Sequence, residues 1–135
     1  MNAATINAGD ALPPLFIGPI ARATLALYAG ASGDRNPIHI DSDVAKAAGL
    51  GDVIVHGMLN MAYLGRLLCA WQPQASLRRF SVRFQGIVHA QATLTCTGTV
   101  AHIERNDNQT LATLELTATD QHGTVALSGE ALVAL

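Results

Sequence analysis

One acid and one base lie close together in this chain, and an apolar helical segment begins shortly after them. Asp34 and His39 are five residues apart, with Asn36-Pro37 between them, and the apolar segment begins at Gly57. An acid and a base can move a proton to or from water, and backbone N–H groups at a helix N-terminus can stabilise an oxyanion. These residues therefore predict a site that holds a water, moves a proton and binds a developing negative charge.

Two short helices are expected on either side of the Asp34–His39 turn. Residues 21–29 are rich in Ala and Leu, and we expect this helix to end at Gly30. Residues 41–43 offer an N-cap for a helix at 44–48, which Gly49 would end. A helix on each side would hold the turn in place.

The rest of the chain predicts one long helix and a sheet. Residues 57–71 are apolar around nearly the whole helical circumference, which is typical of a buried helix, and Pro73 follows them. From residue 77 the hydrophobic period changes to two, with turn residues at 106–108 and 120–123. We expect a four-stranded antiparallel meander that wraps around the helix.

The beginning of the chain is less regular. Residues 15–20 form a short apolar run that could be a first strand, and residues 1–15 are small and polar. We expect these opening residues to be loose. The two cysteines, Cys69 and Cys96, form no CxxC pair, and we expect both to be buried, reduced thiols.

Composition limits the class of protein. The 135 residues fit a single domain, 1–135. Half of the residues are apolar and 13% are charged, which favours burial of part of the surface against another subunit. The net charge of −2 argues against nucleic acid or an anionic membrane as the main partner. The chain has neither an apolar run of about 18 residues nor a secretory signal, so we expect no membrane span and a cytoplasmic location.

The stretch around the acid and the base resembles the hydratase-2 motif, which marks MaoC-like (R)-specific enoyl-CoA hydratases and 3-hydroxyacyl-thioester dehydratases. The matching residues are 32–39, Ala47, Gly49 and 56–58. The resemblance extends to residues 80–84 and covers most of residues 28–84. It implies an α+β hot-dog fold, in which an antiparallel sheet wraps around a long central helix, and a dimer, here expected to be a homodimer.

The resemblance also implies a hydro-lyase of fatty acid metabolism that adds water reversibly to trans-2-enoyl thioesters. It places the catalytic pair on Asp34 and His39 and the oxyanion donor on the Gly57 N–H. We favour His39 as the base, and expect Asn36 to hold the loop beside the substrate. No metal and no cofactor are expected beyond the coenzyme A or acyl-carrier protein that forms part of the substrate, and His56 is assigned to the scaffold.

Several features leave alternatives open. Arg79 and Arg83 share a strand face and could bind coenzyme A phosphates or an acidic carrier protein, or could lie on a solvated outer face. The family's Pro-Val-x-Pro-Gly turn is absent from residues 85–91, and Gly65 stands where these hydratases can carry a small polar residue. The alternative functions are a tailoring dehydratase or cyclase of polyketide or specialised-lipid synthesis, a non-catalytic subunit that binds acyl thioesters, and, less favoured, a thioesterase.

Overall fold

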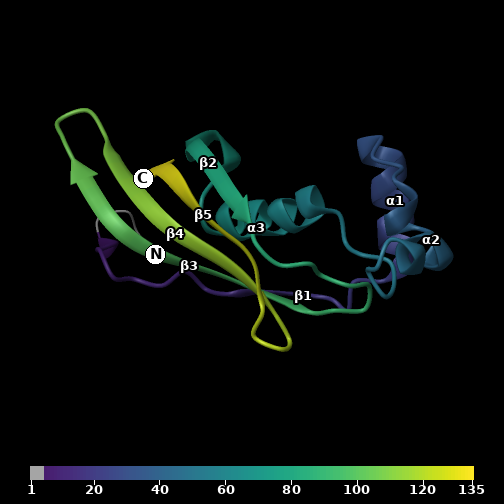
Figure 1. Ribbon diagram of the computed structural model, residues 1–135. Helices are drawn as coiled ribbons and strands as arrows, with labels where there is room; N and C mark the ends of the chain where they lie inside the picture. The colour runs from purple at the N-terminus through teal and green to yellow at the C-terminus, as the bar shows by residue number, and fades with distance from the viewer. Residues whose placement is uncertain (1–4) are drawn as a thin grey trace.

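The computed structural model describes residues 5–135 and has a twisted sheet with a long helix against it (Figure 1). The helices are α1 (Arg22–Ser32), α2 (Ser42–Ala47) and α3 (Gly57–Trp71), with 3-10 turns η2 (Pro37–His39) and η3 (Gln74–Ser76). The strands are β1 (Leu15–Ile17), β2 (Leu77–Phe84), β3 (Leu94–Arg105), β4 (Thr110–Asp120) and β5 (Val125–Ala134). In Figure 1, α1 and α2 lie together beyond one end of α3, away from most of the sheet.

The five strands pair antiparallel in the order β1-β3-β4-β5-β2. The predicted meander is correct for β3, β4 and β5, and wrong for β2, which pairs with β5 from Leu77↔Val133 to Phe84↔Leu127. The physical reason is the connection that follows β2. It does not turn back as a hairpin but runs past the segment before α3, where Ile54 and His89 form an isolated bridge. The chain thus passes from the β2 edge of the sheet to the opposite edge, where β3 begins beside β1.

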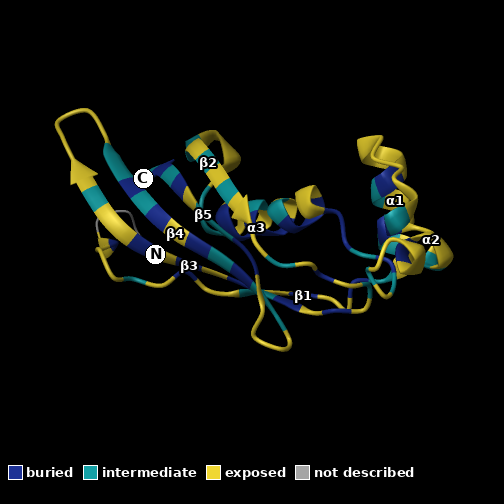
Figure 2. Cartoon of the chain, in the orientation of Figure 1, coloured by how far each residue is buried: buried dark blue, intermediate teal, exposed yellow. Residues whose placement is uncertain are grey.

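The core lies between α3 and one face of the sheet. Alternate residues of the long strands are buried, as the period of two predicts (Figure 2). From α3, Leu64, Leu67 and Leu68 are at most 2% exposed. Burial of each such side chain is worth about 1.5–3 kcal/mol.

The opposite side of α3 faces outward, which corrects the expectation of a helix buried all round. Met58 is 56% exposed, and Ala62, Arg66, Cys69 and Ala70 are exposed as well. The sheet covers one side of a helix only, so these positions, most of them small or apolar, remain uncovered in the single chain. The expectation that both cysteines are buried is therefore wrong for Cys69.

The opening segment is held more firmly than expected. Residues 1–4 lie outside the described part of the chain, so the structure does not test the expectation that they are loose. From residue 5 onward it is wrong, because Ile6 and Leu12 are at most 4% exposed. The Gly9 N–H donates to the Val100 carbonyl at 2.7 Å, and the Leu12 N–H donates to the Gly98 carbonyl at 2.9 Å. The segment packs along β3.

The boundary of α1 differs from the prediction in a way that matters for the acid. The helix continues through Gly30 and ends at Gly33, whose φ of +79° is the left-handed conformation that glycine adopts without strain. Asp34 therefore follows the helix end directly. The N-cap of α2 is Asp41, whose carboxylate accepts from the N–H groups of Asp43 and Val44.

Asp52 ties α1 and α2 to the segment that leads into α3. Its carboxylate accepts hydrogen bonds from the Val53 N–H at 2.7 Å and the Ser42 hydroxyl at 2.8 Å, and it pairs with Arg22 at 2.6 Å. These contacts lower the pKa of Asp52 to about 2.

Within the described residues, none of the helices has the length and apolar character needed to cross a membrane.

Candidate active site

The loop after α1 positions the acid. The Asn36 N–H donates to Asp34 Oδ1 at 3.3 Å, and the Asn36 side-chain oxygen accepts from the Ile38 N–H at 3.2 Å. Asn36 is thus the N-cap of η2, and its side-chain oxygen serves the loop. With Oδ1 held from behind, Oδ2 is the Asp34 oxygen that faces His39.

His39 is buried and held in one orientation. It is 7% exposed, and its Nδ1 lies 2.8 Å from the Ile54 carbonyl oxygen. A carbonyl only accepts hydrogen bonds, so Nδ1 carries the proton and the Nε2 of the neutral ring carries a lone pair. That Nε2 lies 3.8 Å from Asp34 Oδ2. This gap is too long for a direct hydrogen bond and suits a shared water between a base and an acid.

His56 contacts both members of the pair. Its Nε2 donates to the Asp34 backbone carbonyl at 3.1 Å, and its ring stacks on His39 with centroids 3.8 Å apart. The Tyr28 ring meets it edge-on at 4.7 Å. Burial lowers the pKa of His56, although the hydrogen bond to Asp34 acts in the opposite direction. A neutral His56 can lie against His39 without charge repulsion while fixing the loop that carries the acid.

Gly57 is the first residue of α3, directly after His56. The N–H groups of Leu59 and Asn60 donate to the His56 carbonyl, whereas the Gly57 N–H precedes the first intrahelical bond. A Cβ at Gly57 would meet the Phe84 ring at 3.3 Å. The missing side chain therefore leaves room for Phe84, and the free N–H at the positive end of the helix dipole remains available to an oxyanion.

Asp34, His39 and His56 are also grouped closely enough to be considered as metal ligands, with one atom from each within 4.8 Å of the others. The ring geometry argues against this use. The two imidazole planes are 21° apart and stacked, so their nitrogen lone pairs lie in nearly parallel planes and do not converge on one point. The arrangement suits proton transfer better than coordination.

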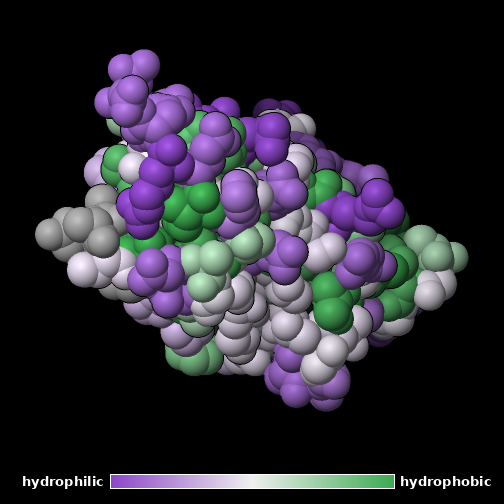
Figure 3. All heavy atoms as spheres, turned by 90° about the vertical axis from the view of Figure 1, so that its left-hand side faces the viewer, coloured by the Kyte–Doolittle hydropathy of each residue, from purple (hydrophilic) through white to green (hydrophobic). Residues whose placement is uncertain are grey.

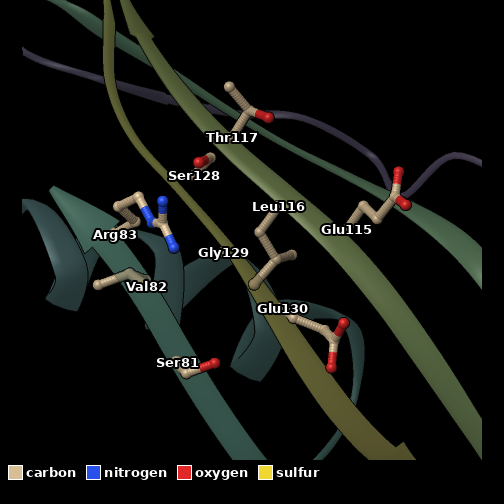
Figure 4. Close-up of a pocket in the computed structure, with 9 residues that line it drawn as sticks. All are labelled: Ser81, Val82, Arg83, Glu115, Leu116, Thr117, Ser128, Gly129 and Glu130. Carbon is tan, nitrogen blue, oxygen red and sulfur yellow. The ribbon is translucent and has the colours of Figure 1, made fainter. Parts of the chain in front are cut away.

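Arg79 and Arg83 lie on the sheet near glutamate side chains. Arg79 pairs with Glu130 at 2.9 Å. Arg83 lines a hollow of about 450 Å³ over β2, β4 and β5, where Figure 4 shows it beside Ser128 in the same hollow as Glu115 and Glu130. The Glu130 carboxylate opposes the charge of Arg79, whereas Arg83 shares its hollow with Glu115 and Glu130 but makes no ion pair among the described residues.

Some contributions to the site were missing from the sequence interpretation. The Ile54 carbonyl fixes the tautomer of His39, and a backbone oxygen leaves no signal in a residue pattern. The contact of Tyr28 with His56 joins positions far apart in the chain. Gly65, singled out for its place on the helix, lies under Phe80, where an added Cβ would make an ordinary contact of 3.6 Å.

An antiparallel sheet around a central helix, with an acid and a base beside the helix N-terminus, defines a hot-dog protein with a candidate acid–base site. The chain belongs to the MaoC-like family: residues 13–122 match the family described as MaoC like domain. It is 31% identical to the "(R)-specific enoyl-CoA hydratase" of Rhodospirillum rubrum over 116 residues, which are 84% of this chain and 78% of that protein.

Other relatives differ in length. The chain is 40% identical over 81 residues to the "3-hydroxyacyl-thioester dehydratase X" of Mycobacterium tuberculosis, covering 60% of this chain and 28% of that protein. It spans 4% of the fatty acid synthase subunit beta of Gibberella zeae, to which it is 38% identical. Among solved structures, the (R)-hydratase from A. caviae involved in PHA biosynthesis has a TM-score of 0.86 and 28% identity, and covers 98% of this chain and 99% of its own. These likenesses agree with the fold expected from the motif.

Proposed function

We propose that this protein is an (R)-specific enoyl-CoA hydratase or 3-hydroxyacyl-thioester dehydratase, which interconverts trans-2-enoyl and (R)-3-hydroxyacyl thioesters. The observation that carries the proposal is the 3.8 Å gap between His39 Nε2 and Asp34 Oδ2 beside the start of α3. A water held between these atoms meets one base and one acid. The names of the hydratase and dehydratase relatives support the same chemistry.

In the hydration direction, His39 Nε2 takes a proton from the water while the water oxygen forms a bond to C3. The π electrons of the C2–C3 double bond move toward the thioester, whose carbonyl oxygen becomes negative. The Gly57 N–H donates to this oxygen, and preorganised donors of this kind stabilise charge that develops in a transition state. A proton returned to C2 restores the thioester, and Asp34 shares in this transfer. Dehydration reverses these steps.

The proposal includes a second copy of the chain. β2 forms one edge of the sheet and pairs only with β5 among the described strands, and unpaired edges invite another strand. Phe84 at the end of this strand is 52% exposed, and Met58 and Ile87 are also more than half exposed. Figure 3, which looks onto the left-hand side of Figure 1, shows hydrophobic atoms gathered between hydrophilic ones on that face of the molecule. Pairing across β2 would cover the apolar residues beside Gly57 and exclude water from the site.

The remaining elements of the proposal concern the substrate and the setting. The acyl group is carried by coenzyme A or by an acyl-carrier protein, and no separate cofactor or metal takes part. Asn36 supports the loop next to the substrate, and Arg79 and Arg83 contact a carrier only when they leave their carboxylate neighbours. We place the protein in the cytoplasm and treat residues 1–135 as a single domain.

The test incubates the protein with a short trans-2-enoyl-CoA. Absorbance of the conjugated thioester and release of free thiol are followed in parallel, and chiral analysis identifies the 3-hydroxyacyl product. Hydration predicts loss of absorbance without thiol release and an (R) product. Thiol release would instead indicate a thioesterase, and no change in either signal would favour a non-catalytic or specialised-lipid protein.

A further inference from the structure

A second hollow lies beside α3, away from the arginine-lined one on the sheet. Its volume is about 310 Å³, and β1, the start of α1 and the middle of α3 form its walls. The polar side chains that line it are Thr24, Tyr63 and Arg66, and exposed Phe16 and buried Ile17 supply an apolar wall. Every polar side chain in this lining can donate a hydrogen bond, and no carboxylate is among them.

The strongest of these donors have no partner among residues 5–135. Tyr63 is 8% exposed, and its hydroxyl makes no hydrogen bond in the described part of the chain. Burial raises the pKa of Tyr63, so the phenol stays neutral and keeps its proton. Arg66 is exposed and makes neither an ion pair nor a hydrogen bond with residues 5–135. An unopposed guanidinium beside a buried, free hydroxyl favours an anionic ligand.

The hollow lies along the same side of α3 as the candidate active site. His56, Leu59, Tyr63 and Arg66 follow the i, i+3, i+7, i+10 spacing of one helix face. On α1, Thr24 precedes by one turn Tyr28, the residue whose ring meets His56. Along α3, His56 beside the acid–base pair thus lies at one end of this face, and the donors Tyr63 and Arg66 of the hollow lie further along it.

The distance along α3 between Gly57 and Arg66 suits a thioester carrier. Arg66 is nine residues after Gly57, which at 1.5 Å per residue places it about 13.5 Å along the helix axis. A pantetheine arm separates a thioester from its phosphate by an extended chain that can cover this distance. The phosphate is common to coenzyme A and to the prosthetic arm of a carrier protein.

We propose that Arg66, Tyr63 and Thr24 form the subsite that binds the phosphate of the substrate's phosphopantetheine arm. The proposal rests on the proposed function and adds the contact that recognises the carrier. It assigns the contact to Arg66 in place of Arg79, which pairs with Glu130, and of Arg83, whose hollow also holds Glu115 and Glu130, because the hollow beside Arg66 has no carboxylate in its lining.

The test compares Arg66→Gln with wild type on two substrates, a trans-2-enoyl-CoA and the same acyl group on N-acetylcysteamine, which lacks a phosphate. We expect KM for the coenzyme A thioester to rise about tenfold in the variant, as for loss of a hydrogen bond to a charged group. We expect kcat, and both constants for the N-acetylcysteamine thioester, to stay within about twofold of wild type. Lys46→Gln is the matched control, since it removes one positive charge from an exposed site on α2. A smaller rise in KM is expected for Tyr63→Phe.

The outcomes separate the possible sources of error. An equal rise in KM for both thioesters, or no rise for either, overturns the subsite. An Arg66→Gln effect confined to acyl groups with a terminal carboxylate overturns it as well, because the anion would then belong to the acyl chain. An effect seen with enoyl-CoA and absent with an enoyl-phosphopantetheine would assign Arg66 to another phosphate of coenzyme A. If wild type hydrates neither substrate, the proposed function fails, and calorimetric binding of coenzyme A to wild type and Arg66→Gln still decides the subsite.

Discussion

The gap between Asp34 and His39 predicts that their contributions to catalysis are coupled. Asp34→Asn removes the charge and His39→Gln removes the imidazole base, and each change keeps a polar side chain of related shape. Proton-transfer groups contribute about 10²- to 10⁴-fold, so each single variant should lose at least about 10²-fold in kcat. In the proposed mechanism one water spans the 3.8 Å between the two side chains, so removing either partner disables the same step. The double variant should therefore lose little more than the worse single variant.

The structure separates this loss of activity from a loss of folding. The Asp34 side chain is 53% exposed, so Asp34→Asn should leave the melting temperature nearly unchanged. His39 is buried, and its Nδ1–H donates to the Ile54 carbonyl. Loss of that hydrogen bond costs about 0.5–1.5 kcal/mol, a modest part of the roughly 5–15 kcal/mol that stabilises a typical protein. His39→Gln should thus melt a few degrees lower and remain folded at the assay temperature.

The assay measures kcat and KM for hydration of a short trans-2-enoyl-CoA with wild type, both single variants and the double variant, after circular dichroism has shown that each is folded. Independent groups would multiply, so two losses of about 10²-fold would give about 10⁴-fold in the double variant. Multiplication of the two losses would refute the shared water. Near-full activity in either single variant would refute the assignment of that residue.

Three further predictions concern the His56 hydrogen bond, the pKa of Asp52 and the exposure of the two cysteines. His56→Phe keeps a ring against His39 and loses the hydrogen-bond donor to the Asp34 carbonyl. We expect kcat to fall about 2- to 10-fold in this variant and less in His56→Gln. Unchanged kinetics would show that this hydrogen bond does not position the acid. The pKa of Asp52, about 2, lies below its usual 3.8, so its contribution to stability is complete above pH 4 and disappears as the pH falls toward 2. Acid unfolding of Asp52→Asn should lack this component, and identical acid transitions would contradict the prediction. Native protein should react with one equivalent of a thiol reagent, at exposed Cys69. Cys96 is buried and its pKa is raised to about 11, so it should react only after unfolding. Rapid reaction of two thiols in native protein would contradict the structure.

Local rules predicted the parts of this protein that depend on neighbouring residues. The helix at 57–71 was predicted with its observed bounds, because apolar residues occupy most of its positions from Gly57 to Trp71 and Pro73 follows. Alternation predicted the buried rows of β3 and β4. The N-cap of α2 was predicted within residues 41–43 and is Asp41, because the cap interaction reaches only two or three residues; α2 itself begins at Ser42, two residues earlier than predicted.

Errors appeared where a local signal had two candidates. Gly30 and Gly33 were both possible helix ends, and only Gly33 has the left-handed conformation. The position of β2 was wrong because strand order depends on where a connection runs, and residue periodicity contains no information about that path. The exposed side of α3 was predicted to be buried, since composition does not reveal whether this chain or a second one covers it.

The sequence by itself determined that an acid, a base and a helix start belong to one site, because the motif specifies their types and spacing. Only the tertiary structure decided how they work together. It supplied the Ile54 carbonyl that leaves a lone pair on His39 Nε2, the ring of His56 that joins both members of the pair, and the 3.8 Å gap that suits a water. It also distinguished arginines that look alike in the sequence, because Arg79 has a glutamate partner and Arg66 does not. These distinctions depend on contacts between distant residues, which form only when the chain has folded.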